Sequence, residues 1–191
     1  MNARLGVLGE AHTAEEAEQQ RELVRRFTTG RRVAAGTDFS LLDDDGRLTG
    51  PPATWQLSPG LGLALEPLAE VIRYSLSLPR RVHEIVILAT ARVEDNDFER
   101  WAHIRAGRAA GLSDSEIDEL LGGSPRFTDP AESAAYDLAR LLLSGQPLGD
   151  IEFDDAVSAL GRTAVFEIVT LVGYYRMMAL QLRAFDVRPP S

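Results

Sequence analysis

Residues 79–112, PRRVHEIVILATARVEDNDFERWAHIRAGRAAGL, decide the fold of this chain. They predict two helices, over about residues 80–92 and 97–110, joined by a short acidic turn. The first predicted helix is apolar on nearly every side, which indicates that it is buried. Glu84 nevertheless lies within it, on a face that has little reason to meet water.

The second predicted helix places a carboxylate and an imidazole on one face. Glu99 and His103 are four residues apart, a spacing at which side chains on a helix meet. Ala106 and Ala110 continue the same stripe, and their small side chains leave volume beside the polar pair. Two carboxylates and one imidazole on adjoining buried helices predict an acid–base site formed by Glu84, Glu99 and His103.

Each of these three residues also has a purely structural interpretation. Glu84 would pair with Arg80 or Arg81 at the helix start, an interaction of about 0.3–0.5 kcal/mol if exposed. Glu99 would be an ordinary helix-surface partner of His103, and His103 would be a satisfied histidine of the core or surface. The sequence leaves both interpretations open.

Neighbouring residues are expected to have structural roles. His83 lies about 100° around the helix from Glu84, so we expect it to cap or pack outside the site. Asn96 precedes the second helix and is a strong candidate for its N-cap. Tyr174 and Tyr175 are expected to lie in the core or at a subunit interface.

The rest of the chain continues the helical pattern. Capping signals and apolar residues at helical spacing predict helices over about residues 13–27, 59–77, 113–121, 131–144, 152–160 and 162–185. Residues 31–53 predict an extended connection packed over the core, with Gly50-Pro51-Pro52 among its strongest helix breakers. We expect an all-α bundle with a single domain, in which residues 1–54 form an arm, a helix and this connection, and residues 55–188 form the helical domain.

Composition excludes several classes of function. The net charge of −9 argues against nucleic-acid binding, which needs clustered cations. The chain has no cysteine, which excludes disulfides and thiolate chemistry, and its three histidines form no His-x-x-x-His pair, so we expect neither a metal site nor a cofactor. It lacks a run of about 18 apolar residues and a secretory signal, so we expect no membrane span and a cytoplasmic location.

Residues 79–123 resemble the carboxymuconolactone decarboxylase family, the all-α group that also contains the alkylhydroperoxidase D proteins. The family places a Glu on one helix, then Cys-x-x-Cys or a variant of it about twelve residues later, then a His four residues past the second Cys position. Counted from Glu84, these positions fall on Asn96, Glu99 and His103 without a gap. The similarity extends upstream through Trp55-x-x-Ser58-Pro59, and it covers about residues 39–185.

The resemblance implies a reaction without thiols. Both cysteine positions are replaced, by Asn96 and Glu99, so thiol-based peroxide reduction is excluded. It implies a cofactor-independent lyase or isomerase that acts on a small carboxylated or lactone-type substrate. His103 would be the general acid or base, Glu99 would set its tautomer, and Glu84, with its pKa raised by burial, would donate or relay the proton.

The resemblance also implies partners. Asn96, Arg100 and Trp55 are candidate substrate-binding residues, and the family is trimeric or hexameric, so we expect a homo-oligomer. The long apolar helix at residues 162–185 offers more hydrophobic surface than one small core readily hides. An alternative function is a non-catalytic oligomeric scaffold or ligand-binding protein of the same fold.

Overall fold

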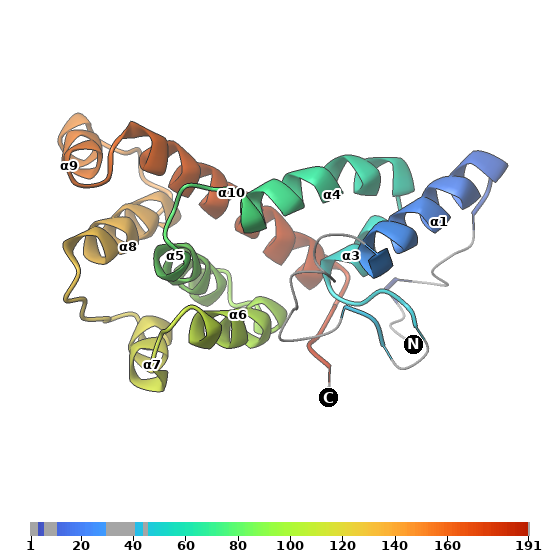
Figure 1. The fold of residues 1–191 in the computed structure, drawn as a ribbon, viewed down its shortest axis with the longest axis horizontal. Helices are drawn as coiled ribbons and strands as arrows, with labels where there is room; N and C mark the ends of the chain where they lie inside the picture. The colour runs from blue at the N-terminus through green and yellow to red at the C-terminus, as the bar shows by residue number, and fades with distance from the viewer. Residues whose placement is uncertain (1–3, 6–10, 30–40, 44–45, 191) are drawn as a thin grey trace. The chain divides into compact units, whose positions relative to one another are not determined.

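The computed structural model describes residues 4–5, 11–29, 41–43 and 46–190, and within these ranges the protein is all-α (Figure 1). No strand occurs in this part of the chain, where an isolated antiparallel bridge joins Leu42 to Leu48. The prediction of an all-α fold is therefore confirmed. The predictions for residues 30–40 and for most of the N-terminal arm lie outside the described residues.

The contacts of the chain divide it into two compact units. The first unit comprises Met1–Leu76 and Gln181–Ser191, and the second comprises Ser77–Leu180. The boundary at 54/55 within a single domain, which was drawn from the sequence, stays a prediction. Every helix predicted from the sequence is present in the described ranges, with ends shifted by at most three residues.

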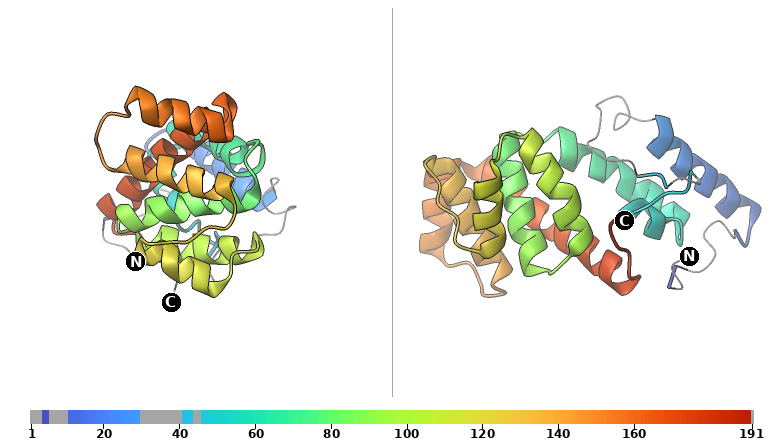
Figure 2. Two further views of the ribbon diagram at one scale, coloured as in Figure 1. Left: turned by 90° about the vertical axis from the view of Figure 1, so that its left-hand side faces the viewer. Right: turned by 90° about the horizontal axis from the view of Figure 1, so that it is seen from below.

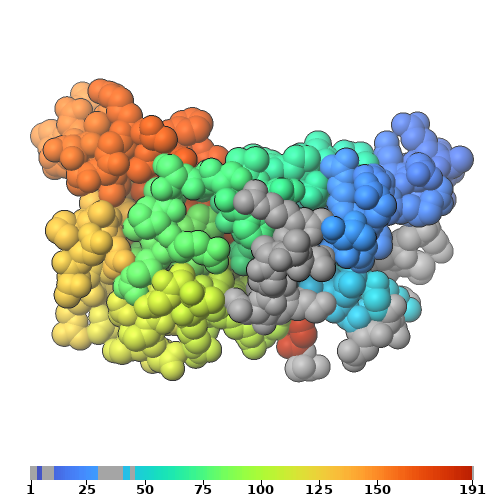
Figure 3. Space-filling model, viewed as in Figure 1, coloured from blue at the N-terminus to red at the C-terminus, as the bar shows by residue number. Residues whose placement is uncertain are grey.

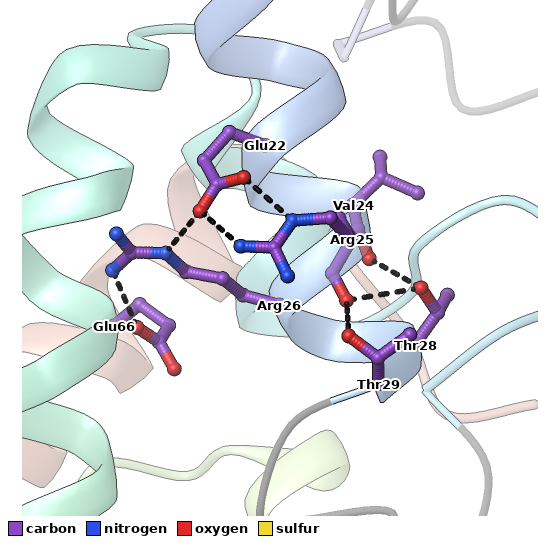
Figure 4. A network of polar contacts seen from close by, with 7 residues as sticks. All are labelled: Glu22, Val24, Arg25, Arg26, Thr28, Thr29 and Glu66. Carbon is purple, nitrogen blue, oxygen red and sulfur yellow. Dashed lines mark hydrogen bonds and ion pairs between the residues drawn. The ribbon is translucent and has the colours of Figure 1, made fainter.

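The first unit is built on the packing of α1 against α4. Its helices are α1 (Ala14–Thr29), α3 (Pro51–Trp55) and α4 (Pro59–Tyr74), together with the last residues of α10. Glu22 pairs with Arg25 and Arg26 along α1, and Arg26 continues to Glu66 on α4 at 3.0 Å (Figure 4). This ion-pair chain links the facing sides of the two helices.

Helix α3 corrects the expectation that Gly50-Pro51-Pro52 interrupts helical structure. The two prolines occupy the first positions of α3, where no backbone N–H is needed and the fixed φ of proline suits a helix. Thr54 Oγ1 donates back to the Pro51 carbonyl at 2.8 Å, and Trp55 ends the helix with a buried side chain. Residues 51–53, which were predicted to be extended, are therefore helical.

The second unit is a stack of helices. It contains α5 (Arg80–Val93), α6 (Asp97–Ala109), α7 (Asp114–Gly122), α8 (Pro130–Leu143), α9 (Asp150–Leu160) and α10 (Arg162–Ala184) as far as Leu180. Helix α9 packs on α8, α8 packs on α5, and α5 packs on α6 and α7, as the left view of Figure 2 shows in layers. The same order of α9, α8 and α7 runs down one side of Figure 3.

Helix α5 is the central helix of this unit, as its sequence predicts. Every residue from Val82 to Ala91 is buried. One cluster of its core consists of Ile85, Leu88, Leu112, Ile117 and Leu120. A Cβ atom at Gly107 of α6 would lie 3.1 Å from Leu112 Cδ1 and 3.4 Å from Leu88 Cδ1 of α5, so glycine permits the close packing of α6 beside α5.

By length and composition alone, α10 would be able to cross a membrane, a result that the sequence argument against a span did not anticipate. Core helices of soluble proteins pass the same test, and 44% of the apolar window of α10 is buried inside the structure. Within this helix Glu167 accepts a hydrogen bond from the Ser77 hydroxyl at 2.8 Å, and Arg176 pairs with Glu94 at 2.8 Å. These contacts make α10 a packing helix of the second unit.

Candidate active site

The second unit brings together the three residues that the sequence singled out. Glu84 projects from α5 and His103 from α6, and His103 Nδ1 lies 2.7 Å from Glu84 Oε2. Both side chains are almost fully buried, with exposed fractions of 2% for Glu84 and 3% for His103. The two polar groups therefore form a short contact between two helices, shielded from bulk water.

Glu99 lies on the other side of the same imidazole. Its Oε2 is 3.3 Å from His103 Nε2, across the i, i+4 spacing of α6, and its exposed fraction is 4%. Each ring nitrogen of His103 thus faces a carboxylate. The two contacts are unequal, because the one to Glu84 is shorter by 0.6 Å.

The Glu99 carboxylate is the outer end of this arrangement. The structure records no further partner for it within the described residues. A side-chain oxygen can be buried and also lack a hydrogen bond. Neither oxygen of Glu99 is in that condition. The second oxygen of Glu99 therefore retains some contact with solvent, whereas both oxygens of Glu84 face histidines.

His83 joins the cluster, although we expected it to cap or pack outside the site. Its Nδ1 lies 3.3 Å from Glu84 Oε1, and the residue is buried. The expectation considered the angle between neighbouring residues on α5 but not the reach of the two side chains toward each other. The adjacency of a histidine and a glutamate in a buried helix was the available signal.

Tyr175 of α10 also contacts the imidazole. Its ring meets that of His103 edge-to-face, with centroids 4.9 Å apart and planes at 89°. Tyr174 in turn meets Tyr175 edge-to-face at 5.3 Å. The sequence predicted a core or interface aromatic at this position, and the assignment of Tyr175 to the cluster was missed because no local spacing connects residues 72 positions apart.

The protonation of the buried pair differs from the expectation. Burial alone would raise the pKa of Glu84, but the charge of His103 and hydrogen bonds from His103 and His83 outweigh it, so the pKa of this carboxyl falls well below its ordinary value. Burial would lower the pKa of His103, yet Glu84 and Glu99 raise it overall. The predicted rise in the pKa of Glu84 is wrong, because the opposite charge beside it prevails over desolvation.

Arg81 does not act as the structural partner proposed for Glu84. It binds the buried Glu132 through Nε at 2.6 Å and Glu116 through a terminal nitrogen at 2.7 Å, and it donates to the Gly111 carbonyl. These contacts tie α5 to α7 and α8. The partners of Glu84 are instead the two histidines.

Two of the candidate substrate-binding residues have structural contacts in the second unit. Asn96 caps α6, since its side-chain oxygen accepts from the Glu99 N–H at 2.9 Å and its amide nitrogen donates to the Ala179 carbonyl at 3.2 Å. Arg100 pairs with Asp95 and Asp97 at the acidic turn. The N-cap prediction for Asn96 is confirmed, and a role for either residue in substrate binding stays a prediction.

The third candidate, Trp55, belongs to the first unit. Its indole nitrogen donates to Gln181 Oε1 at 3.1 Å, and its ring packs on Phe27 at a centroid distance of 5.8 Å. Its substrate-binding role also stays a prediction. No group of three or more metal-ligating side chains is arranged to hold an ion within the described residues.

A comparison with known protein families finds a match over the helices that carry this site. The sequence model of the carboxymuconolactone decarboxylase family matches residues 59–141, a stretch that contains Glu84, Glu99 and His103. The chain, which contains no cysteine, is similar to the carboxymuconolactone decarboxylase family over this segment. No curated protein matches the chain by sequence.

The similarity to the carboxymuconolactone decarboxylase family spans the segment that carries the site and leaves its chemistry to the residues present. The matched segment covers less than half of the chain and ends before α10, so it does not include Tyr175. Because the chain contains no cysteine, a thiolate nucleophile is absent. The groups gathered here are suited to moving a proton between carboxylates and an imidazole.

Proposed function

We propose that this protein is a cofactor-independent lyase or isomerase that transfers a proton to or from a small carboxylated or lactone-type substrate. The observation that carries the proposal is the imidazole of His103 held between two buried carboxylates, with a short contact on one side and a longer one on the other. The family name supports a decarboxylase-like reaction.

The unequal contacts suggest a division of roles between the two acids. Glu84 Oε2 accepts a hydrogen bond from the protonated Nδ1 of His103 at 2.7 Å, which orients the ring and stabilises the imidazolium. Nε2 is held only loosely by Glu99, so this nitrogen is the one that exchanges a proton with a substrate. Glu99 then receives or returns that proton at the solvent side. The roles of Glu84 and Glu99 are the reverse of those expected from the sequence.

The proposed chemistry is protonation of an enolate or carbanion. In a decarboxylation, the electrons of the broken carbon–carbon bond remain on the substrate as an enolate while carbon dioxide leaves. The proton on His103 Nε2 then passes to the substrate carbon, and Glu99 supports reprotonation of the ring. A positioned acid of this kind contributes about 10²–10⁴-fold in rate.

The composition of the cluster also favours a functional interpretation. Glu84 already pairs with His103 at 2.7 Å, and burying a second acidic side chain, Glu99, against the same imidazole costs free energy. A purely structural pair would need only one of the two acids. The second acid, Glu99, is explained if it takes part in proton exchange.

The alternative is a non-catalytic oligomeric scaffold or ligand-binding protein of the same fold. The observation that favours it is the closure of the cluster, since Glu84, Glu99 and His103 each have an exposed fraction of 4% or less. A cluster that admits no substrate would serve only to join α5 and α6. The cytoplasmic location and the homo-oligomeric state stay predictions under both functions.

Turnover assays distinguish the two functions. A panel of lactone carboxylates and β-keto acids is tested with the wild type, His103→Ala and Glu99→Gln, with Glu119→Gln as a matched change at an exposed ion pair of the same unit. We expect turnover that falls at least about 100-fold in the first two variants and is unchanged in Glu119→Gln. Equal activity in all variants would remove the mechanism, and a wild type inactive on the whole panel would favour the scaffold.

A further inference from the structure

The inner acid of the cluster is shared between two imidazoles. Glu84 Oε2 lies 2.7 Å from His103 Nδ1, and Glu84 Oε1 lies 3.3 Å from His83 Nδ1. The two oxygens of a carboxylate can accept hydrogen bonds from two different donors at once. The proton transfer proposed above uses Glu84, Glu99 and His103, and it leaves this second histidine without a role.

His83 meets the cluster inside the fold and not at its surface. Its side chain is 8% exposed, and that of Glu84 is 3% exposed. It binds the carboxylate oxygen that His103 does not use. In such a sheltered place water does not replace a hydrogen bond that is lost, so each bond of the cluster affects the strength of the next one.

The proton in the contact between His83 and Glu84 lies on the histidine. Although burial raises the pKa of Glu84, the charge of His103 and the hydrogen bonds from both histidines bring it well below its ordinary value, so the carboxyl is ionised. An ionised carboxylate accepts hydrogen bonds and has no proton to donate. His83 Nδ1 is therefore the donor.

We propose that His83 is a positioning residue that donates to Glu84 Oε1, weakens the hold of Glu84 on His103, and so sets the pH at which His103 releases its proton. A carboxylate that already accepts one hydrogen bond attracts a second donor less strongly. Without His83, Glu84 would bind the imidazolium more tightly, and His103 would keep its proton to a higher pH. The consequence for turnover rests on the proposed function, whereas the effect on the proton of His103 does not.

A general acid benefits from such moderation. Burial lowers the pKa of His103, but Glu84 and Glu99 raise it overall. An acid is most effective when its pKa lies near the working pH, because a proton that is held too firmly is transferred slowly. The hydrogen bond from His83 opposes part of the rise that Glu84 causes, and the proton on Nε2 stays transferable.

The other ionisable groups around His103 are accounted for. Glu84 faces its ring from α5, Glu99 from α6 and Tyr175 from α10. Helix α7 also packs on α6, and its charged side chains are exposed or paired with arginines: Asp114, Glu116, Asp118 and Glu119. Substitution of His83 therefore changes one partner of Glu84 and keeps the groups that face His103 directly.

NMR spectroscopy of the wild type tests the first step. The chain has three histidines, so the ring signals of the full-length protein with isotope-labelled histidine can be assigned by single substitutions. We expect the Nδ1 of His83 to carry a proton between about pH 6 and 8, as its bond to an ionised carboxylate requires. An unprotonated Nδ1 in this range would overturn the proposal without any variant.

Two substitutions at His83 test the coupling to His103. His83→Leu removes the donor, whereas His83→Asn keeps an amide N–H close to the position of Nδ1. His12→Leu makes the same change at an exposed histidine and is the matched control. In His83→Leu we expect the NMR titration midpoint of His103 to rise by at least about 0.5 pH units. In His83→Asn the rise should be less than half as large, and in His12→Leu the midpoint should not move.

Two results of these titrations would overturn the proposal. The first is a midpoint in His83→Leu that is unchanged or lowered. The second is an equal rise in His83→Leu and His83→Asn, since this would assign the effect to lost packing and not to the donor. If His83→Leu does not fold, the tautomer of His83 in the wild type decides.

Turnover gives a separate reading. On any substrate of the lactone carboxylate and β-keto acid panel that is converted, the alkaline limb of the pH–rate profile should move upward in His83→Leu by the same amount as the His103 midpoint, because the acid must be protonated to act. A limb that stays in place while the midpoint moves would overturn the role in catalysis. A shifted midpoint in a protein inactive on the whole panel would support the coupling and count against the proposed function alone.

Discussion

His103 and Glu84 form a buried ion pair between α6 and α5, with Nδ1 2.7 Å from Oε2. The second ring nitrogen of His103 faces Glu99 at the longer distance of 3.3 Å. This inequality separates an inner acid, which is enclosed by histidines, from an outer acid, which retains contact with solvent. The two acids should therefore respond differently to the same chemical change.

Glu84→Gln should destabilise the fold strongly. Removal of one partner from a buried ion pair costs about 3–5 kcal/mol, and we expect the lower end because Glu99 still faces the imidazole. Urea denaturation of the wild type and the variant, followed by circular dichroism, measures the difference in the free energy of unfolding. A change below about 1 kcal/mol would contradict a charged inner pair.

Glu99→Gln should change stability much less than Glu84→Gln. Its contact with His103 is long and its second oxygen touches solvent, so we expect a change within about 1 kcal/mol of the wild type, in either direction. The proposed function requires that the same variant nevertheless loses turnover. Denaturation and turnover measured on one preparation test both statements, and a loss of stability equal to that of Glu84→Gln would refute the division of roles.

The stability of the fold should decrease on both sides of a window of pH. The pKa of Glu84 is lowered in the fold, so its contribution is present above its unfolded pKa of about 4.3 and is lost as the pH falls. The pKa of His103 is raised, so its contribution is full below about 6.5 and is lost as the pH rises through the folded pKa. We expect greatest stability between about pH 4.5 and 6.5.

The alkaline side of this window is the diagnostic one. Glu116, whose pKa the Ser113 cap and Arg81 lower to about 2, also contributes to the acid side. Denaturation curves of the wild type and His103→Ala across the pH range isolate the histidine, because the variant should lose the decline above pH 6.5. Identical slopes above that pH would show that His103 is not the titrating group.

The sequence predicted the backbone better than the contacts around His103. Helix ends followed local signals, such as the Ser113–Glu116 capping box and the Asn96 cap, both of which are present. The Glu99–His103 pair also followed from local spacing on one helix. Tyr175 and the lowered pKa of Glu84 did not, because both depend on how separate helices pack.

Helix α3 is an element for which the local sequence signal was misleading. The sequence interpretation took Pro51 and Pro52 as breakers, since proline inside a helix removes a hydrogen bond. The same residues are favourable in the first turn, and only the following Ala-Thr-Trp packing decides between the two outcomes. A local signal with two meanings cannot be resolved without its tertiary context.

Tyr175→Ala should destabilise the second unit and expose the imidazole of His103. Truncation of a buried aromatic costs about 3–5 kcal/mol through lost packing and the cavity that remains. Tyr175→Phe keeps the ring that meets His103 at 4.9 Å, so we expect it to stay within about 1.5 kcal/mol of the wild type. Chemical denaturation measures both variants, and equal losses would show that the hydroxyl, not the ring, is the important group.

Arg81→Met should destabilise the fold far more than a matched change at an exposed arginine. Arg81 binds Glu132, whose side chain is only 8% exposed. Removal of the Arg81 guanidinium therefore leaves a buried carboxylate without its cation, which should cost about 3 kcal/mol. Arg108→Met removes the exposed pair with Asp114, which is worth at most about 1 kcal/mol. Urea denaturation compares the two variants. Restoration of stability by Glu132→Gln in the Arg81→Met background would assign the loss to the stranded carboxylate, whereas equal effects of the two arginine changes would refute the importance of burial at this junction of α5, α7 and α8.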